Sequence, residues 1–326
     1  MKADATARLG RTSLSVSRLS FGTAPLGNLF EAVTEEAAAA ALEAAWSSGV
    51  RFFDTAPLYG HGLAETRLGR FLRGKPRDSY SVATKVGRLL RADVQPEPGQ
   101  PYVDVPAVNP TFDFSRDATL RSVEESLQRL GLDRVDVLHI HDPDDHYQEA
   151  LEGAYPALDG LRSEGVIAAV GAGMNQWQML SRFAREADFD CFLLAGRYTL
   201  LDQSAFAELL PLAVGKGIAI IAAGVFNSGV LADPRPGARY NYRPAPPQLI
   251  EKARRIAAVC ARHGIPLGTA AVQFPSAHPA VPTVLIGSRS AAQVLENVSG
   301  FEAPVPDQLW AELKAEGLLA EGVPTP

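Results

Sequence analysis

The run Arg51-Phe52-Phe53-Asp54-Thr55-Ala56-Pro57-Leu58-Tyr59-Gly60 begins with a short apolar stretch and then turns polar. Short apolar runs are typical of buried parallel strands, whose carboxyl ends lie at one edge of the sheet. Asp54 closes the apolar stretch and Tyr59 lies in the loop just beyond it. The run therefore predicts a strand that places a carboxylate and a phenol at one edge.

Two later runs end in the same way. Lys85 closes the segment 80–84, and His141 closes the segment 135–140. In a barrel of strands and helices, the chemistry lies at the carboxyl ends of the strands. The three strand ends and the loop would thus bring a carboxylate, a phenol, an ammonium and an imidazole to one mouth.

Strand-like and helix-like segments alternate along the whole chain, which predicts a parallel α/β architecture. A doubly wound sheet would need a G-x-G-x-x-G motif after the first strand, but the chain has Gly22-Thr23-Ala24-Pro25-Leu26-Gly27 there. With no break in composition, we interpret residues 1–326 as a single-domain (β/α)8 TIM barrel. The proline-rich stretch 88–114 has little periodicity and is interpreted as a lid over the mouth. Strands are expected at 19–23, 51–53, 80–85, 135–141, 167–171, 191–194, 218–222 and 281–286.

The composition excludes several classes of protein. The net charge of −6 gives no basic surface for nucleic acid or an anionic membrane. No run approaches the ~18 apolar residues of a membrane span, and the amino terminus lacks a signal-peptide core, so we expect a cytoplasmic location. Cys191 and Cys260 show no spacing with histidine that would indicate a metal site. The sequence does not indicate an oligomeric state.

The D-T-A-x-x-Y-G run, Lys85 and His141 together resemble the aldo-keto reductases, and the resemblance extends from Leu9 to Asn297. The stretches 138–142 and 194–201 are most similar to the bacterial branch that oxidises free aldoses. The resemblance implies hydride transfer between a nicotinamide cofactor and a small sugar or aldehyde.

The four polar residues suit that chemistry on physical grounds. Free tyrosine has a pKa of ~10, too high for an efficient base near neutrality. An ammonium beside the phenol stabilises phenolate, and a buried carboxylate keeps the ammonium charged and in place. We therefore expect Tyr59 to be the acid/base, with Lys85 and Asp54 in those two supporting roles. His141 is expected to hydrogen-bond the substrate oxygen, whereas His139 is expected to be a packing residue.

The resemblance also implies a set of cofactor residues. Asn175 would hold the nicotinamide amide and Tyr198 would stack on its ring, while the loop after the seventh strand would lie under the pyrophosphate. Members committed to NADPH often carry cations where this chain has Gly287 and Gln293, which favours NAD here, although Arg289 could still hold the extra phosphate of NADP. The expected cofactor residues are Asn175, Tyr198, Gly224, Phe226, Asn227, Gly229, Leu231, Gly287, Ser288, Arg289, Gln293, Glu296 and Asn297.

His61 and Asp142 are the candidate substrate residues, the first lying two residues after Tyr59 and the second opening an acidic loop after His141. The expected reaction is oxidation of the anomeric hydroxyl of a free aldose, of the L-fucose, L-galactose or D-arabinose type, to its lactone. The same site could serve an NADPH-dependent reductase of small aldehydes and ketones, or a pyridoxal 4-dehydrogenase. An aldolase that forms a Schiff base on Lys85, and a non-catalytic nicotinamide-sensing subunit, are the alternatives from other classes.

Overall fold

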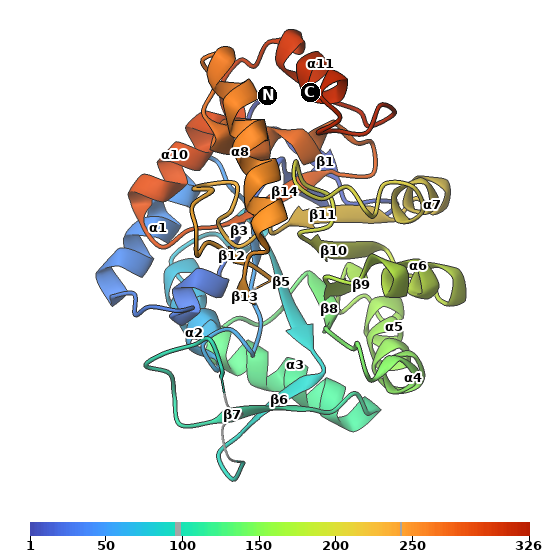
Figure 1. Ribbon diagram of the computed structural model, residues 1–326. Coiled ribbons are helices and arrows are strands. Elements are labelled where there is room, and N and C mark those ends of the chain that lie inside the picture. The colour runs from blue at the N-terminus through green and yellow to red at the C-terminus, as the bar shows by residue number, and fades with distance from the viewer. Residues whose placement is uncertain (95–98, 242) are drawn as a thin grey trace.

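Eight parallel strands close into a barrel at the centre of the molecule, and helices surround it (Figure 1). The computed structural model describes residues 1–94, 99–241 and 243–326, so 95–98 of the expected lid lie outside the described residues. The predicted (β/α)8 barrel is confirmed. Its strands are β3 (Leu19–Gly22), β4 (Phe52–Asp54), β5 (Ser81–Val86), β8 (Val137–His141), β9 (Ala169–Met174), β10 (Cys191–Ala195), β11 (Ala219–Ala223) and β14 (Thr283–Gly287).

The helices begin and end at residues that suit their ends. The Thr34 side chain accepts a hydrogen bond from Ala37 N at the start of the first helix, and Ser115 does the same for Ala118 N further along. Gly131 ends that later helix in the left-handed conformation. The helices are α1 (Glu35–Ser47), α2 (Leu63–Leu72), α3 (Arg116–Leu130), α4 (Tyr147–Glu149), α5 (Tyr155–Ser163), α6 (Trp177–Glu186), α7 (Leu209–Lys216), α8 (Pro247–Arg262), α9 (Leu267–Gln273), α10 (Ala291–Glu302) and α11 (Asp307–Ala315).

The barrel strands bury both faces, which is why they read as apolar runs rather than as alternating ones. Outward side chains such as Phe53 and Ile140 join the large core between barrel and helices. Inward side chains such as Phe52 and Val137 form a second, smaller core inside the barrel. Every second side chain of a strand therefore points towards the barrel axis, which leads to the mouth.

A hairpin that the sequence patterns did not predict closes the amino end of the barrel. Strands β1 (Thr6–Arg8) and β2 (Ser15–Ser17) pair antiparallel. Leu9 and Val16 belong to the same buried cluster as the inward side chains of the barrel. The hairpin thus fills the end opposite the predicted mouth.

The stretch 88–114, interpreted as a lid, contains two further strands that the sequence patterns did not predict. Strands β6 (Arg88–Arg91) and β7 (Asn109–Phe112) pair antiparallel and form an arm at the lower edge of the view in Figure 1. Before β7, the chain at Pro101 contacts the loop that follows β3, where Phe30 N donates to Pro101 O at 2.7 Å. A second short hairpin, β12 (Arg239–Tyr240) and β13 (Arg243–Pro244), lines a pocket together with Gly99–Pro101 of the lid.

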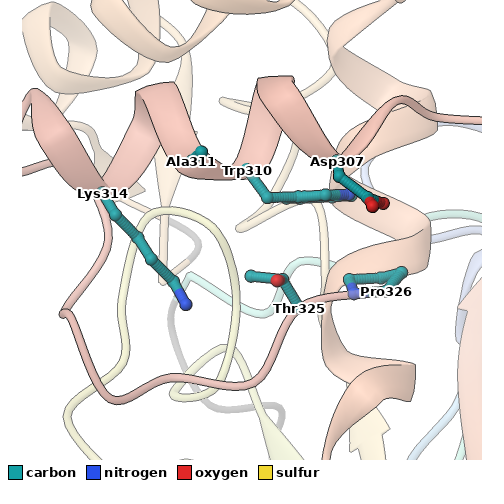
Figure 2. A pocket seen from close by; sticks show the side chains of 6 residues that line it. All are labelled: Asp307, Trp310, Ala311, Lys314, Thr325 and Pro326. Atoms are coloured by element: carbon teal, nitrogen blue, oxygen red, sulfur yellow. The ribbon is translucent and has the colours of Figure 1, made fainter.

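Two surface pockets flank this architecture. One, of about 390 Å³, lies between α11 and the chain end, where Asp307, Trp310 and Pro326 face one another (Figure 2). The other, of about 490 Å³, separates the lid at Gly99–Pro101 from Arg239 and Arg243. Among the described residues, no helix has the length and apolar character needed to cross a membrane.

Candidate active site

The last inward-facing residues of the eight strands divide the mouth of the barrel into two halves. Three neighbouring strands, β4, β5 and β8, end in the polar side chains Asp54, Lys85 and His141. The other five strands present only glycine or alanine there. One half of the mouth is therefore chemically reactive, and the other is smooth enough for a flat ring to lie against backbone. The small residues are Gly22, Gly173, Ala195, Ala223 and Gly287.

A buried ion pair forms the base of the reactive half. Lys85 Nζ donates to Asp54 Oδ1 at 2.5 Å and to Thr55 O at 2.8 Å, and the side chains of Lys85 and Asp54 are 1% and 2% exposed. Burial raises the pKa of Asp54, while the Lys85 ammonium opposes that rise. Because neither charge can be solvated there, each one requires the other.

The loop after β4 brings Tyr59 over this ion pair. Lys85 Nζ lies 4.6 Å from the centroid of the Tyr59 ring. The His141 ring approaches edge-on at 5.7 Å between centroids. A Cβ at Gly27 would lie 2.6 Å from Gly60 N, so the turn depends on a glycine packed against it. The phenol, ammonium, carboxylate and imidazole predicted from sequence thus lie together.

His141 is held neutral by its surroundings. Burial lowers its pKa well below the ordinary value, and the cations of Lys85 and Arg88 lower it further. Its Nε2 lies 3.5 Å from Asp142 Oδ2, which favours the tautomer with a proton on Nε2. Within the described part of the chain, Nδ1 has no hydrogen-bond partner. The imidazole is therefore suited to donate a hydrogen bond rather than to carry a charge.

His139 lies one layer deeper on the same strand face, as its spacing from His141 predicts. It is fully buried, and burial lowers its pKa to about 3. Neither ring nitrogen finds a partner among the described residues. A Cβ at Gly171 would lie only 2.2 Å from its Nδ1, so the ring occupies space that a glycine vacates.

The two candidate substrate residues lie at the rim, and both have left-handed backbone. The φ angles are 52° at His61 and 43° at Asp142. His61 Nδ1 lies 2.6 Å from Val108 O of the lid, and its pKa is lowered by burial. Non-glycine residues with positive φ are uncommon and often mark ligand sites.

Sequence reasoning missed Arg88, which begins β6 immediately after the mouth. Arg88 Nη2 donates to Asp142 Oδ2 at 3.2 Å, and its guanidinium stacks 4.3 Å from the centroid of the Phe112 ring. The available signal was its position three residues after the strand-ending Lys85, with Gly87 (φ 98°) turning the chain between them.

Asn175 and Tyr198, the two expected nicotinamide contacts, lie in different surroundings. Strand β9 extends to Met174, so Asn175 follows it directly, and its Nδ2 donates to Ala195 O at 2.7 Å beside the smooth half of the mouth. Tyr198 is only 2% exposed, and its ring packs 5.1 Å from that of Phe274 and 5.5 Å from that of His278. A ring buried in this outer core has no open face, so the stacking role expected for Tyr198 does not fit its position.

In the loop after β11, the main chain at the glycines has free space beside it, whereas the larger side chains are packed into the protein. Gly224 and Gly229 have φ angles of 62° and 103°, and a Cβ at Gly229 would have no described atom within 4 Å. Asn227, by contrast, is buried and bonds to Gly196 O at 3.1 Å and to Thr199 Oγ1 at 2.7 Å. Phe226 and Leu231 pack on the outer core. The main chain of this loop, rather than the Asn227 side chain, is what a ligand could contact.

The loop after β14 leads into the amino terminus of α10. Ser290 caps that helix, and Ser288 accepts a bond from Asn297 Nδ2 at 3.1 Å. Helix amino termini bind anions well. Arg289 already donates to Leu29 O at 2.8 Å and lies 3.1 Å from Glu31. Its backbone N donates to Gln293 Oε1 at 2.8 Å, while Glu296 is exposed on the helix.

These features fit a dinucleotide. The smooth half of the mouth would receive a flat ring, the open backbone near Gly229 would lie under a pyrophosphate, and the α10 terminus would take the remaining end. In the described ranges, no three His, Cys, Asp or Glu side chains gather in a way that could hold a metal ion.

Comparison with known proteins agrees with this geometry. The model of the "Aldo/keto reductase family" matches residues 18–316. The chain is 45% identical to D-threo-aldose 1-dehydrogenase of a Pseudomonas species, covering 96% of each chain. It is 43% identical to pyridoxal 4-dehydrogenase of Microbacterium luteolum, covering 98% of this chain and 99% of the relative.

Two more distant relatives extend the comparison. The chain is 33% identical to L-galactose dehydrogenase of Arabidopsis thaliana, over 89% of this chain and 86% of that one. A solved aldo-keto reductase from Bacillus halodurans, in its holo form, superimposes with a TM-score of 0.76 at 26% identity, covering 99% and 98% of the two chains.

Proposed function

The chain belongs to the aldo/keto reductase family and is an oxidoreductase of that type, and we propose that it oxidises the anomeric hydroxyl of a free aldose to the lactone. The observation that supports this most strongly is the divided mouth, where Asp54, Lys85, Tyr59 and His141 face a floor of glycine and alanine. Acid/base groups beside a flat, unobstructed floor are what hydride transfer requires.

Each polar residue has one task in the proposed reaction. Tyr59 takes the proton of the anomeric hydroxyl as the C1–O bond becomes a carbonyl. Lys85, kept charged by Asp54, stabilises the phenolate that must accept this proton. The Nε2–H of the neutral His141 donates to the reacting oxygen and orients it.

The cofactor completes the balance of atoms and electrons. The nicotinamide, when bound, accepts the C1 hydrogen with its electron pair, so the sugar is oxidised and the cofactor is reduced. We propose Asn175 and the backbone near Gly229, Gly287 and Ser288 as its contacts. NAD is favoured over NADP because Arg289 is already paired with Glu31, whose carboxylate would repel a 2′-phosphate.

The rim of the mouth favours a polyol substrate. Asp142, Arg88 and His61 supply acceptors and donors around the reactive half. Sugar hydroxyls can donate to and accept from these groups, whereas an apolar substrate would cover them without adding a hydrogen bond, which is unfavourable. Two of the relatives named above also act on sugars by name.

One observation favours a second candidate, a pyridoxal 4-dehydrogenase. The Arg88 guanidinium lies at the rim and could pair with an acidic phenol of such a substrate. The relative of that name is 43% identical, close to the 45% of the aldose dehydrogenase. An aldehyde reductase would use the same four residues in reverse.

The alternatives from other classes have less support. A Schiff base on Lys85 needs a neutral, nucleophilic amine, but Asp54 at 2.5 Å favours the charged ammonium. A sensing subunit that binds cofactor without turnover would not need a complete set of acid/base groups around one mouth.

A substrate panel with NAD or NADP tests the proposal. Reduced nicotinamide is followed by absorbance with L-fucose, L-galactose, D-arabinose and pyridoxal. We expect sugar-dependent reduction that is lost when Tyr59 is replaced by Phe. Turnover of pyridoxal alone would transfer the function to the second candidate. Tight cofactor binding with no turnover of any substrate would favour the sensing subunit.

A further inference from the structure

We propose that Asp142 and Arg88 recognise the hydroxyl group next to the reacting carbon, so that the enzyme selects substrates with two vicinal oxygens. This inference rests on the proposed function and specifies the substrate class of the same mouth. Asp142 would accept a hydrogen bond from the neighbouring hydroxyl, and Arg88 would hold the carboxylate in position.

Two polar atoms at the mouth have a spacing that suits two adjacent oxygens of a substrate. His141 Nε2 and Asp142 Oδ2 lie 3.5 Å apart. Vicinal oxygens of a sugar are separated by about the length of one hydrogen bond. A donor at Nε2 and an acceptor at Oδ2 can therefore each contact one of two adjacent oxygens. The reacting oxygen would take the bond from His141, and the next hydroxyl would donate to Asp142.

The backbone of Asp142 supplies a second, independent observation. Its φ is 43°, and the next residue is Pro143, which further restricts the residue before it. Asp142 N donates to Gly173 O at 3.0 Å, which ties this unusual backbone to the end of β9. Strained backbone that is held in place in this manner is typical of ligand clamps.

Arg88 makes the carboxylate rigid from the other side. Its side chain is 14% exposed, and it lies between Asp142 and the Phe112 ring. Its Nε is buried without a partner in the described part of the chain. The Asp142 side chain is 33% exposed, so part of it remains available at the mouth. A purely structural ion pair would not need that opening.

A comparison of L-fucose with 2-deoxy-L-fucose tests the proposal in the full-length enzyme. We expect the wild type to prefer L-fucose by about 10- to 100-fold in kcat/KM, since a site built for a hydroxyl rejects the analogue that lacks it. Asp142→Asn should remove most of this preference by lowering kcat/KM for L-fucose alone. Arg88→Lys should act in the same direction with a smaller effect.

Matched variants control for charge. Asp145→Asn on the same loop is exposed, and Arg91→Lys lies at the outer end of β6, so both should keep the wild-type preference. If Asp142→Asn lowered kcat/KM equally for both sugars, the proposal would be overturned, because Asp142 would then act only on His141. A wild type that oxidises both sugars equally would also overturn it. A wild type that oxidises neither sugar would instead contradict the proposed function.

Discussion

Tyr59 lies at the meeting point of three groups, with Lys85 below its ring and His141 at its edge. We predict that Tyr59→Phe lowers kcat by about 10²- to 10⁴-fold, the range for loss of a general acid/base. Cofactor binding, measured by quenching of protein fluorescence, should stay unchanged because the ring remains. Tyr155→Phe, on the outer side of the barrel, is the matched control and should keep full turnover.

Asp142 should give the enzyme an acidic limb in its pH profile. Removal from water raises the pKa of Asp142 to about 6, with Arg88 and Lys85 opposing the rise and Asp144 adding to it. The carboxylate is therefore ionised above about pH 6 and protonated below. We predict that kcat/KM for an aldose falls as the pH drops through this value. The limb should disappear in Asp142→Asn; its persistence there would assign it to another group.

Glu31 should influence the choice of cofactor. Its carboxylate lies 3.1 Å from Arg289 Nη1 and is exposed. We predict that Glu31→Gln raises the ratio of kcat/KM with NADP to that with NAD by about tenfold, since Arg289 is freed for a phosphate. Glu321→Gln, at the exposed chain end, should leave the ratio unchanged. An unchanged ratio in both variants would remove Arg289 from the adenosine end of the site.

For single residues, the sequence predicts the placement of those that end strands better than the placement of those in loops. Asp54, Lys85 and His141 could be placed because strand parity decides which way they face. Tyr198 could not, because its ring packs against Phe274 and His278, which lie far along the chain. Arg88 was missed because its partners, Asp142 and Phe112, also come from other segments.

At the scale of elements, α2 and α3 cross at a glycine. A Cβ at Gly69 would lie 1.9 Å from Leu130 O, so the backbones are in direct contact. We predict that Gly69→Ala destabilises the protein by about 1–3 kcal/mol or more through overpacking, although alanine is the better helix former. Urea unfolding measures the change. Gly160→Ala in α5, where no described atom lies within 4 Å, should instead add up to about 1 kcal/mol.

The elements that the sequence did not predict are short. Strands β1 and β2 have three residues each, and β6 and β7 have four, which is too few for a period of two to stand out. Helix α7 begins at Leu209, and the chain before it turns around Thr199, whose hydroxyl accepts from Leu201 N and Asp202 N. A π-helical stretch, Ala150–Ala154, joins α4 to α5.

At the scale of the whole molecule, a buried histidine should make the fold sensitive to acid. The pKa of His139 is about 3 in the folded protein, against an ordinary value of 6.5. Below pH 6.5 the unfolded chain binds a proton on His139 that the folded chain does not bind. The folded state therefore keeps its full stability above pH 6.5 and becomes less stable as the pH falls below it. Relative to neutral pH, the loss from His139 alone should reach about 2 kcal/mol at pH 5.

Replacing His139 with Leu tests this effect. The free energy of unfolding of the variant and of the wild type is measured by urea denaturation at neutral pH and at pH 5. On acidification it should fall by about 2 kcal/mol less in the variant than in the wild type. The test compares the change in the free energy of unfolding between the two pH values, so it does not depend on how stable the variant is at either one. If this change is the same in the variant and the wild type, other groups cause the acid sensitivity.

The barrel as a whole was predictable because strand-like and helix-like segments alternate along the chain, and the eight strands close in that order. The substrate was harder to predict, since we expect it to depend on how Pro101 and Val108 of the lid contact Phe30 and His61. Those contacts join segments with no periodic relation in the sequence, so only the folded chain brings them together.

The most direct test of the central claim follows the hydrogen on C1. L-fucose deuterated at C1 is incubated with the enzyme and NAD, and the reduced cofactor and the sugar product are analysed by mass spectrometry. We predict that the deuterium appears in the cofactor, that the sugar becomes its lactone, and that Tyr59→Phe suppresses both. Lactone formation without transfer of the label to the cofactor, or no turnover of any aldose, would contradict it.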